Sequence, residues 1–236
     1  MSGDALCIIP ARGGSKRIPR KNIRPFLGKP IMTYVIEAAL TSGCFAEVMV
    51  STDDDEIAAI AEQYGAKVPF KRSPETSHDH ANFPEVLMET LTEYRKRGRE
   101  FEYCCGCYAT SALTTAQHLR EGYEKLCSDT SLSYVVPVAP FSYPIQRALR
   151  IVAGHIEMFQ PEHYHTRSQE LEKAYHDTGQ WYWMRSNAMF DKIPVFSPSA
   201  NAVIVSDMEA QDIDTEEDWL LAELKYQIRQ ASGPPH

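Results

Sequence analysis

Short apolar runs alternate with amphipathic segments along the first 140 residues, and this alternation restricts the fold more than any other feature. Residues 6–9, 47–52 and 103–108 have the length and apolar content of buried strands. The segments between them place apolar residues at helical spacing. Strands that alternate with helices predict an α/β fold, in which a mainly parallel sheet carries helices on both faces. Ligands of such sheets bind beyond the carboxyl ends of the strands.

The alternation stops after Phe141. Residues 147–152 and 155–159 flank Ala153-Gly154 and predict a hairpin, and residues 180–184 predict an aromatic strand. We interpret residues 142–185 as an insertion into a single domain, residues 1–228, followed by a disordered tail, residues 229–236. A chain of 236 residues, 43% of them hydrophobic, can bury one substantial core.

A basic loop follows the first predicted strand. Between residues 5 and 37 the chain has seven basic residues and no acidic one, although its formal net charge is −8. Gly13 and Gly14 lack Cβ atoms, so their amides can approach a ligand closely. The spacing fits neither the P-loop nor the Gly-x-Gly-x-x-Gly fingerprint. The loop predicts a binding site for a triphosphate; a merely solvated basic loop is the alternative.

Composition restricts the partners and the location of the protein. The net negative charge argues against sequence-independent binding of nucleic acid, which needs a broad positive surface. The N-terminus lacks the features of a signal peptide, and no apolar run approaches the roughly 18 residues of a membrane span. Six irregularly spaced cysteines indicate reduced thiols, so we expect a cytoplasmic protein without membrane or nucleic-acid partners.

The segment Ile9-Pro-Ala-Arg-Gly-Gly-Ser-Lys-Arg-Ile-Pro-Arg-Lys-Asn22 resembles the first signature of cytidylyltransferases that activate acidic nine-carbon sugars, the CMP-sialic acid synthetase family. The resemblance extends to about Leu224. It implies a Rossmann-like fold of the nucleotide-diphospho-sugar transferase type, with CTP and an acidic nine-carbon sugar as substrates. The matching insertion of the family packs against a second subunit, so the resemblance also implies a homodimer.

The same resemblance assigns residues to CTP. Arg12, Lys16 and the two glycine amides would hold the β- and γ-phosphates, and Arg12 and Lys16 would stabilise the leaving charge. The expected CTP-binding residues are Pro10, Ala11, Arg12, Gly13, Gly14, Ser15, Lys16, Asn22, Arg72, Ser77 and Asp79.

Asp212-Ile213-Asp214 lies just before the last predicted helix, whose cap is expected at Thr215. In an extended segment, both carboxylates project to one side and Ile213 faces the core. Two carboxylates suit Mg²⁺, which completes its octahedron with waters and phosphate oxygens. Helix capping by Asp214 is the alternative, and the match to the final motif of the family favours Mg²⁺. Either aspartate is a candidate to take the proton of the sugar.

Two segments depart from the sialic acid pattern. Residues 108–114 keep Thr110, Ser111 and Leu113 but change the other positions of the motif Gln-Pro-Thr-Ser-Pro-Leu-Arg. Residues 175–183 keep the glycine of the motif Arg-Pro-Asn-Gly as Gly179 but replace Arg-Pro-Asn by residues 176–178. The second segment resembles the branch of the family that acts on pseudaminic acid. Its aromatic residues Trp181 and Trp183 suit a less hydrophilic sugar, or else pack in the core. The expected sugar-binding residues are Thr110, Ser111, Gln146, Arg147, Tyr175, His176, Asp177 and Gln180.

The expected reaction is therefore transfer of CMP from CTP to the anomeric hydroxyl of pseudaminic acid. N-acetylneuraminic acid, legionaminic acid and 3-deoxy-manno-octulosonic acid are alternative acceptors. A catalytically silent nucleotide-binding module is a more remote alternative. The presence of both Asp212 and Asp214 together with Arg12 and Lys16 argues against it.

Overall fold

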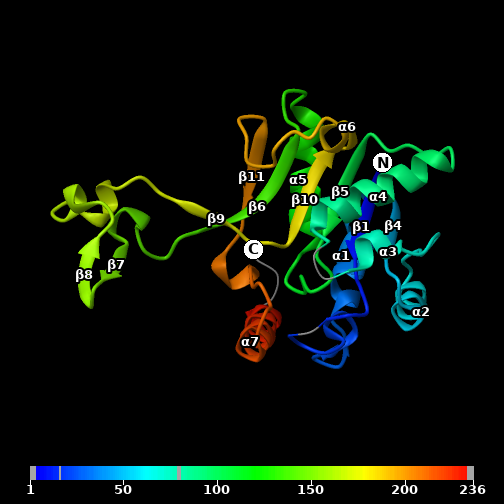
Figure 1. Ribbon diagram of the computed structural model, residues 1–236, viewed down its shortest axis with the longest axis horizontal. Coiled ribbons are helices and arrows are strands. Elements are labelled where there is room, and N and C mark those ends of the chain that lie inside the picture. The colour runs from blue at the N-terminus through cyan, green and yellow to red at the C-terminus, as the bar shows by residue number, and fades with distance from the viewer. Residues whose placement is uncertain (1–3, 16, 79–80, 233–236) are drawn as a thin grey trace.

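The computed structural model describes residues 4–15, 17–78 and 81–232. These residues form a seven-stranded sheet in the order β11-β6-β10-β5-β1-β4, and β9 also pairs with β6 (Figure 1). The strands are β1 (Ala5–Pro10), β4 (Phe45–Ser51), β5 (Tyr103–Cys107), β6 (Tyr134–Pro140), β9 (Tyr175–Asp177), β10 (Trp181–Arg185) and β11 (Ala200–Ile204). β1 pairs in parallel with β4 and β5, and β6 with β11, whereas β10 runs antiparallel between β5 and β6. The predicted, mainly parallel α/β fold is confirmed.

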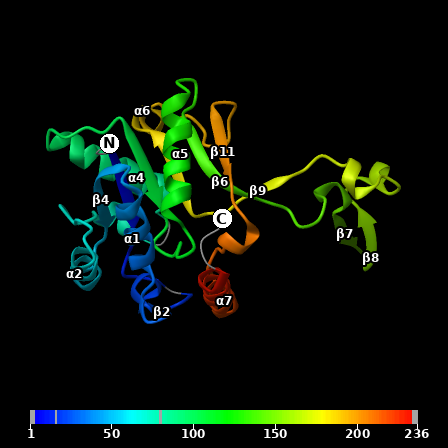
Figure 2. The same ribbon diagram turned by 180° about the vertical axis from the view of Figure 1, so that it is seen from behind.

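Helices cover both faces of the sheet. They are α1 (Met32–Ser42), α2 (Asp55–Gln63), α3 (Pro74–Ser77), α4 (Phe83–Lys96), α5 (Ala116–Ser128), α6 (Ser186–Phe190) and α7 (Glu216–Ser232). Single 3₁₀ turns are η1 (Lys21–Ile23), η2 (Ile145–Arg147), η3 (Pro161–His163), η4 (Ser168–Glu170) and η5 (Asp207–Glu209). Figure 1 views the sheet from the side of α4, and Figure 2 from the side of α1 and α5. In the described part of the chain, no helix is both long and apolar enough to cross a membrane.

Alternate side chains of the strands enter two separate cores, as strand geometry requires. Cys7 and Ile9 of β1 pack toward α1 and α5, while Leu6 and Ile8 pack toward α4 and α6. Trp181 and Trp183 of β10 are fully buried in the first of these cores. The structure therefore supports core packing for both tryptophans rather than contact with a sugar.

Local sequence signals fix several helix ends, and the cap expected at Thr215 is among them. Gly43 follows α1 with φ 70°, a left-handed conformation that glycine adopts without strain. Asp54 caps α2 by accepting two backbone hydrogen bonds. Before α7, the Thr215 hydroxyl accepts from the Asp218 amide and the Asp218 carboxylate accepts from the Thr215 amide. α7 continues to Ser232, so residues 229–232, expected in a disordered tail, are helical.

An arm, residues 141–174, leaves the sheet after β6 and returns at β9 (Figure 1). It contains the predicted hairpin, formed by β7 (Leu149–Val152) and β8 (His155–Met158). The projecting part is shorter than the insertion predicted over residues 142–185, because β9 and β10 pair within the main sheet. A second small hairpin, β2 (Pro25–Phe26) and β3 (Lys29–Pro30), follows the basic loop.

Candidate functional site

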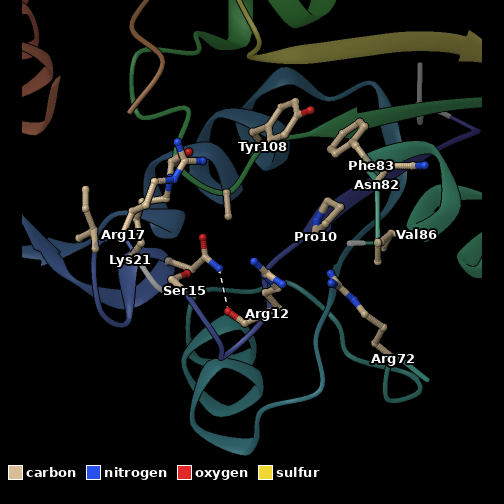
Figure 3. Close-up of a pocket in the computed structure, with 15 residues that line it drawn as sticks. Pro10, Arg12, Ser15, Arg17, Lys21, Arg72, Asn82, Phe83, Val86 and Tyr108 are labelled. Carbon is tan, nitrogen blue, oxygen red and sulfur yellow. Dashed lines mark hydrogen bonds between the residues drawn. The ribbon is translucent and has the colours of Figure 1, made fainter. Parts of the chain in front are cut away.

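A cavity of about 260 Å³ opens beyond the carboxyl ends of β1 and β5 (Figure 3). The basic loop, the start of α4 and the segment after β5 form its walls. Six of the residues predicted to bind substrates line it: Pro10, Arg12, Ser15, Asn22, Arg72 and Thr110. The cavity therefore lies at the carboxyl edge of the sheet, where folds of this kind bind their ligands.

Two arginines bring positive charge to this cavity. Figure 3 shows the guanidinium groups of Arg12 and Arg72 reaching toward the same part of it. Arg72 is only 7% exposed and donates to the Ser51 hydroxyl and, at 2.6 Å, to the Ser51 carbonyl. Burial lowers the pKa of Arg72 to about 10, so the group stays charged at neutral pH. Asn22 donates to the Arg12 carbonyl at 3.0 Å and so fixes the start of the loop.

Acidic residues that precede α2 hold the glycine turn. The Gly13 amide donates to Asp53 at 3.2 Å. A Cβ at Gly13 would lie 2.6 Å from an Asp54 oxygen, which explains glycine at this position, whereas Gly14 faces open space. Arg20 pairs with Asp54 and Glu56, so part of the charge of the basic loop is neutralised internally.

The segment Asp212-Ile213-Asp214 adjoins the cavity through two basic residues that line it. Asp214 lies 2.6 Å from the Arg17 guanidinium and 3.7 Å from the Lys21 ammonium. Lys21 also donates to the Ile213 carbonyl at 2.5 Å. Ile213 is 1% exposed in a third core with Phe26 of β2, as the extended interpretation predicted.

The chemistry of these carboxylates fits a magnesium ion. Desolvation and the neighbouring Asp214 carboxylate raise the pKa of Asp212. Among the described residues, no group of three or more His, Cys, Asp or Glu side chains could hold a metal. A site of two carboxylates is the kind that Mg²⁺ uses with phosphate oxygens and waters, rather than an all-protein cage.

Four of the described residues predicted for CTP do not line the cavity: Ala11, Gly13, Gly14 and Ser77. Ala11 is fully buried in the core. The Ser77 hydroxyl donates to the Ser73 carbonyl at the end of α3. Lys16 and Asp79 lie outside the described residues, so their roles remain predictions.

The predicted sugar ligands are spread over three places. Gln146 and Arg147 lie in η2 on the arm, and neither lines the cavity of its own chain. Tyr175, His176 and Asp177 form β9 at the base of the arm. Ser111 and Gln180 are buried, and the Ser111 hydroxyl donates to the Gln180 carbonyl. Within one chain, only Thr110 of the predicted sugar ligands lines the cavity.

Sequence reasoning missed several residues of the site. Arg17 and Lys21 belong to the basic loop but were not singled out as ligands. Phe83, at the start of α4, stacks on Tyr108 with ring centroids 4.2 Å apart, and both line the cavity. Asn82, which caps α4, also lines it. The apolar residues from Phe83 onward, at helical spacing, predicted a helix, but nothing local to them pointed to a ligand.

The chain belongs to the cytidylyltransferase family, whose model matches residues 6–222. It is 41% identical over 229 residues to the pseudaminic acid cytidylyltransferase of Campylobacter jejuni, covering 97% of this chain and 98% of that protein. It is 32% identical over 230 residues to the CMP-N,N'-diacetyllegionaminic acid synthase of Legionella pneumophila, covering 95% and 97%. The family resemblance seen in the sequence is confirmed.

A solved structure supports the fold independently. The CTP complex of CMP:2-keto-3-deoxy-manno-octonic acid synthetase matches with a TM-score of 0.69, covering 96% of this chain and 99% of that one. At 19% identity this match supports the Rossmann-like transferase fold alone.

Proposed function

We propose that this protein transfers CMP from CTP to the anomeric hydroxyl of pseudaminic acid and releases pyrophosphate. The observation that carries the proposal is one cavity at the carboxyl edge of the sheet, lined by Arg12, Arg72 and Lys21 and adjoined by the carboxylate of Asp214. Cations of this kind hold a triphosphate, and a carboxylate pair beside them suits the metal that accompanies it.

The reaction forms one bond and breaks one bond at the α-phosphorus. The anomeric oxygen attacks this phosphorus in line, the bond to the bridging oxygen of the β-phosphate breaks, and pyrophosphate leaves. The proton of the anomeric hydroxyl passes to Asp212 or Asp214, or to solvent. Arg12, together with Lys16, binds the β- and γ-phosphates, and the positive charge stabilises the leaving group.

Asp212 and Asp214 would hold Mg²⁺. When bound, the ion neutralises phosphate charge and acidifies a coordinated hydroxyl. Lys21 orients this pair by holding the Ile213 carbonyl between them. Asn22 and Arg72 bind the nucleotide from the walls of the cavity.

The acceptor sugar is assigned from the relative in Campylobacter jejuni and from the segment around β9 and β10. The test measures kcat/KM for pyrophosphate release from the four nucleoside triphosphates with a panel of four sugars. The panel contains pseudaminic, N-acetylneuraminic, legionaminic and 3-deoxy-manno-octulosonic acids. We expect CTP and pseudaminic acid to give the highest value. A preference for another sugar would overturn the acceptor, and no turnover with any sugar would overturn the reaction.

We further propose that two copies form a homodimer through the arm. Apolar side chains on its hairpin are largely exposed in the single chain, with Ile151 at 78% and Ile156 at 71%. Such a patch marks an interface. The dimer would carry Gln146 and Arg147 to the cavity of the second copy. A cytoplasmic location fits the six unpaired cysteine thiols.

A further inference from the structure

Gln180 is a buried amide in the short connection between β9 and β10, and its backbone holds one wall of the cavity. The residue is 1% exposed. Its carbonyl accepts hydrogen bonds from the Tyr108 amide at 2.9 Å and from the Ser111 hydroxyl at 3.1 Å. Tyr108 lines the cavity, so the backbone of Gln180 anchors the loop that follows β5.

The side chain of Gln180 reaches a different part of the site. Its Nε2 donates to the Glu209 carbonyl at 2.6 Å, and its Oε1 accepts from the Thr178 hydroxyl at 3.2 Å. Glu209 ends η5, three positions before Asp212. One buried residue thus joins the wall of the nucleotide cavity to the segment that carries the two aspartates.

The opposite side of this segment is held by a second buried side chain. Lys225 of α7 is 7% exposed and donates to the carbonyls of Asp207 and Ala210, each at 2.8 Å. Gln180 holds the segment to the sheet, and Lys225 holds it to α7. Without the Gln180 amide, the Glu209 carbonyl loses this partner, and the bond that ties the segment to the start of β10 is removed.

We infer that Gln180 is a positioning residue that sets the place of the Asp212–Asp214 segment relative to the cavity. The inference deepens the proposed function and rests on it for its catalytic readout. It also gives Gln180 a different role from the sugar ligand that the sequence predicted, because both polar groups of its side chain are already bonded within the chain. A displacement of about 1 Å at a reacting centre can cost about a hundredfold in rate.

The test uses the full chain with two substitutions at the same position. Gln180→Met removes both polar groups at similar volume, and Gln180→Glu keeps the shape but replaces the donor that faces Glu209. Thr178→Val is the matched control, because it removes the donor to Oε1 and leaves the bond to Glu209. Steady-state kinetics with CTP and sugar give kcat and both KM values. Titration with Mn²⁺, followed by electron paramagnetic resonance of the free ion, gives a readout independent of turnover.

We expect kcat to fall about ten- to a hundredfold in both Gln180 variants, with KM for CTP nearly unchanged. We expect Mn²⁺ to bind about tenfold more weakly. Thr178→Val should stay within about threefold of the parent in both measurements.

Several outcomes overturn the inference. They are unchanged kcat and Mn²⁺ affinity in a folded variant, equal losses in Thr178→Val, or failure of both Gln180 variants to fold, which would indicate a role in stability alone. A rise in sugar KM with unchanged kcat and Mn²⁺ affinity would restore the sugar-ligand role. If the parent protein releases no pyrophosphate from CTP, the proposed function fails, while the Mn²⁺ titration still decides the positioning role.

Discussion

Arg72 supports the fold and lines the cavity with the same guanidinium group. Its Nε and Nη2 atoms hold Ser51 at the end of β4, and the group also lines the cavity. Burial of this kind keeps a cation in place, so that little rotamer freedom remains to be lost when a ligand binds. Substitutions of Arg72 and of Ser51 therefore distinguish an effect on ligand binding from an effect on stability.

Replacing the cation should affect binding of CTP. In Arg72→Met we expect KM for CTP to rise about ten- to a hundredfold, because one hydrogen bond to a charged group contributes roughly 1.5–3 kcal/mol. Ser51→Ala is the control, since it removes only the hydroxyl that accepts from Nε. It should lower the free energy of unfolding by about 1 kcal/mol and leave KM nearly unchanged. An unchanged KM in folded Arg72→Met would remove this residue from the site.

Asp54 links pH to stability beside the glycine turn. A hydrogen bond from Arg20 lowers the pKa of Asp54 to about 2, from a usual value of 3.8. A lowered folded-state pKa stabilises the protein above the unfolded-state value, and the contribution is lost as pH falls through the folded-state value. Because Arg20 is partly exposed, solvent screening reduces the contribution to about 1 kcal/mol.

We therefore expect Asp54→Asn, which keeps a capping oxygen, to be less stable than the parent protein at pH 7. The difference should persist down to about pH 4 and shrink between pH 4 and pH 2. Urea unfolding at several pH values measures it. Asp55→Asn is the control, because the carboxylate of Asp55 is 98% exposed. A difference for Asp54→Asn that does not change with pH would contradict the proposed pairing.

At the scale of elements, the connection between β11 and α7 carries the proposed metal ligands. Asp214→Ala should abolish turnover and leave the fold intact, with kcat and kcat/KM falling together at saturating Mg²⁺. Asp212→Ala should act similarly, or more mildly if its contact to the ion passes through water. Asp207→Ala is the control on the same connection, where the carboxylate is 61% exposed. Near-normal kcat in folded Asp214→Ala would exclude this metal site.

The contact of α5 with β10 depends on one glycine in the middle of the helix. A Cβ at Gly122 would lie 2.7 Å from Trp183 and 2.8 Å from Trp181, both fully buried. Alanine normally favours a helix over glycine by about 1 kcal/mol, but overpacking a core costs about 1–3 kcal/mol. We expect the free energy of unfolding to fall in Gly122→Ala, measured with urea, and to stay within about 0.5 kcal/mol in the exposed neighbour Glu124→Ala. A more stable Gly122→Ala would contradict the tight packing.

Local signals made most elements predictable, and distant pairings did not. The apolar run before Pro10, the glycine after α1 and the cap at Thr215 each act within a few residues. By contrast, the aromatic run at β10 showed a strand but not its place between β5 and β6, because that pairing depends on contacts far along the chain.

The same contrast between local signals and distant contacts applies to the candidate site. Its basic loop and paired aspartates form short motifs. The bond from Lys21 to Ile213 joins residues 192 positions apart, and no local pattern encodes it. The sequence predicted that the Gln180 amide binds the sugar, whereas the structure shows that it donates a hydrogen bond to the Glu209 carbonyl.

At the scale of the whole molecule, the cavity lies in the main domain and the exposed apolar surface lies on the arm. The sheet and its helices build the cavity, while the arm extends from β6 and β9 (Figure 2). The apolar side chains of its hairpin are exposed in the single chain. A projecting hairpin of two short strands is marginal in water by itself. Burial against a second copy would stabilise the hairpin and remove the apolar patch from water, so the arm and the dimer should depend on each other.

Reversing the character of one cross-strand pair tests this dependence. Ile151 and Ile156 face each other across the hairpin, and Arg150 and Glu157 form the adjacent pair. The double variant I151E/I156K keeps an attractive cross-strand pair but places two charges where we expect an apolar interface. We expect it to sediment as a monomer in analytical ultracentrifugation at concentrations at which the parent protein is a dimer. The swap R150E/E157R, which preserves the ion pair at 3.1 Å, should remain a dimer.

If both variants remain dimers, or if the parent protein is itself a monomer, the arm is not the interface. Loss of turnover in the monomer, with CTP binding retained, would further indicate that the arm completes the sugar site of the second copy.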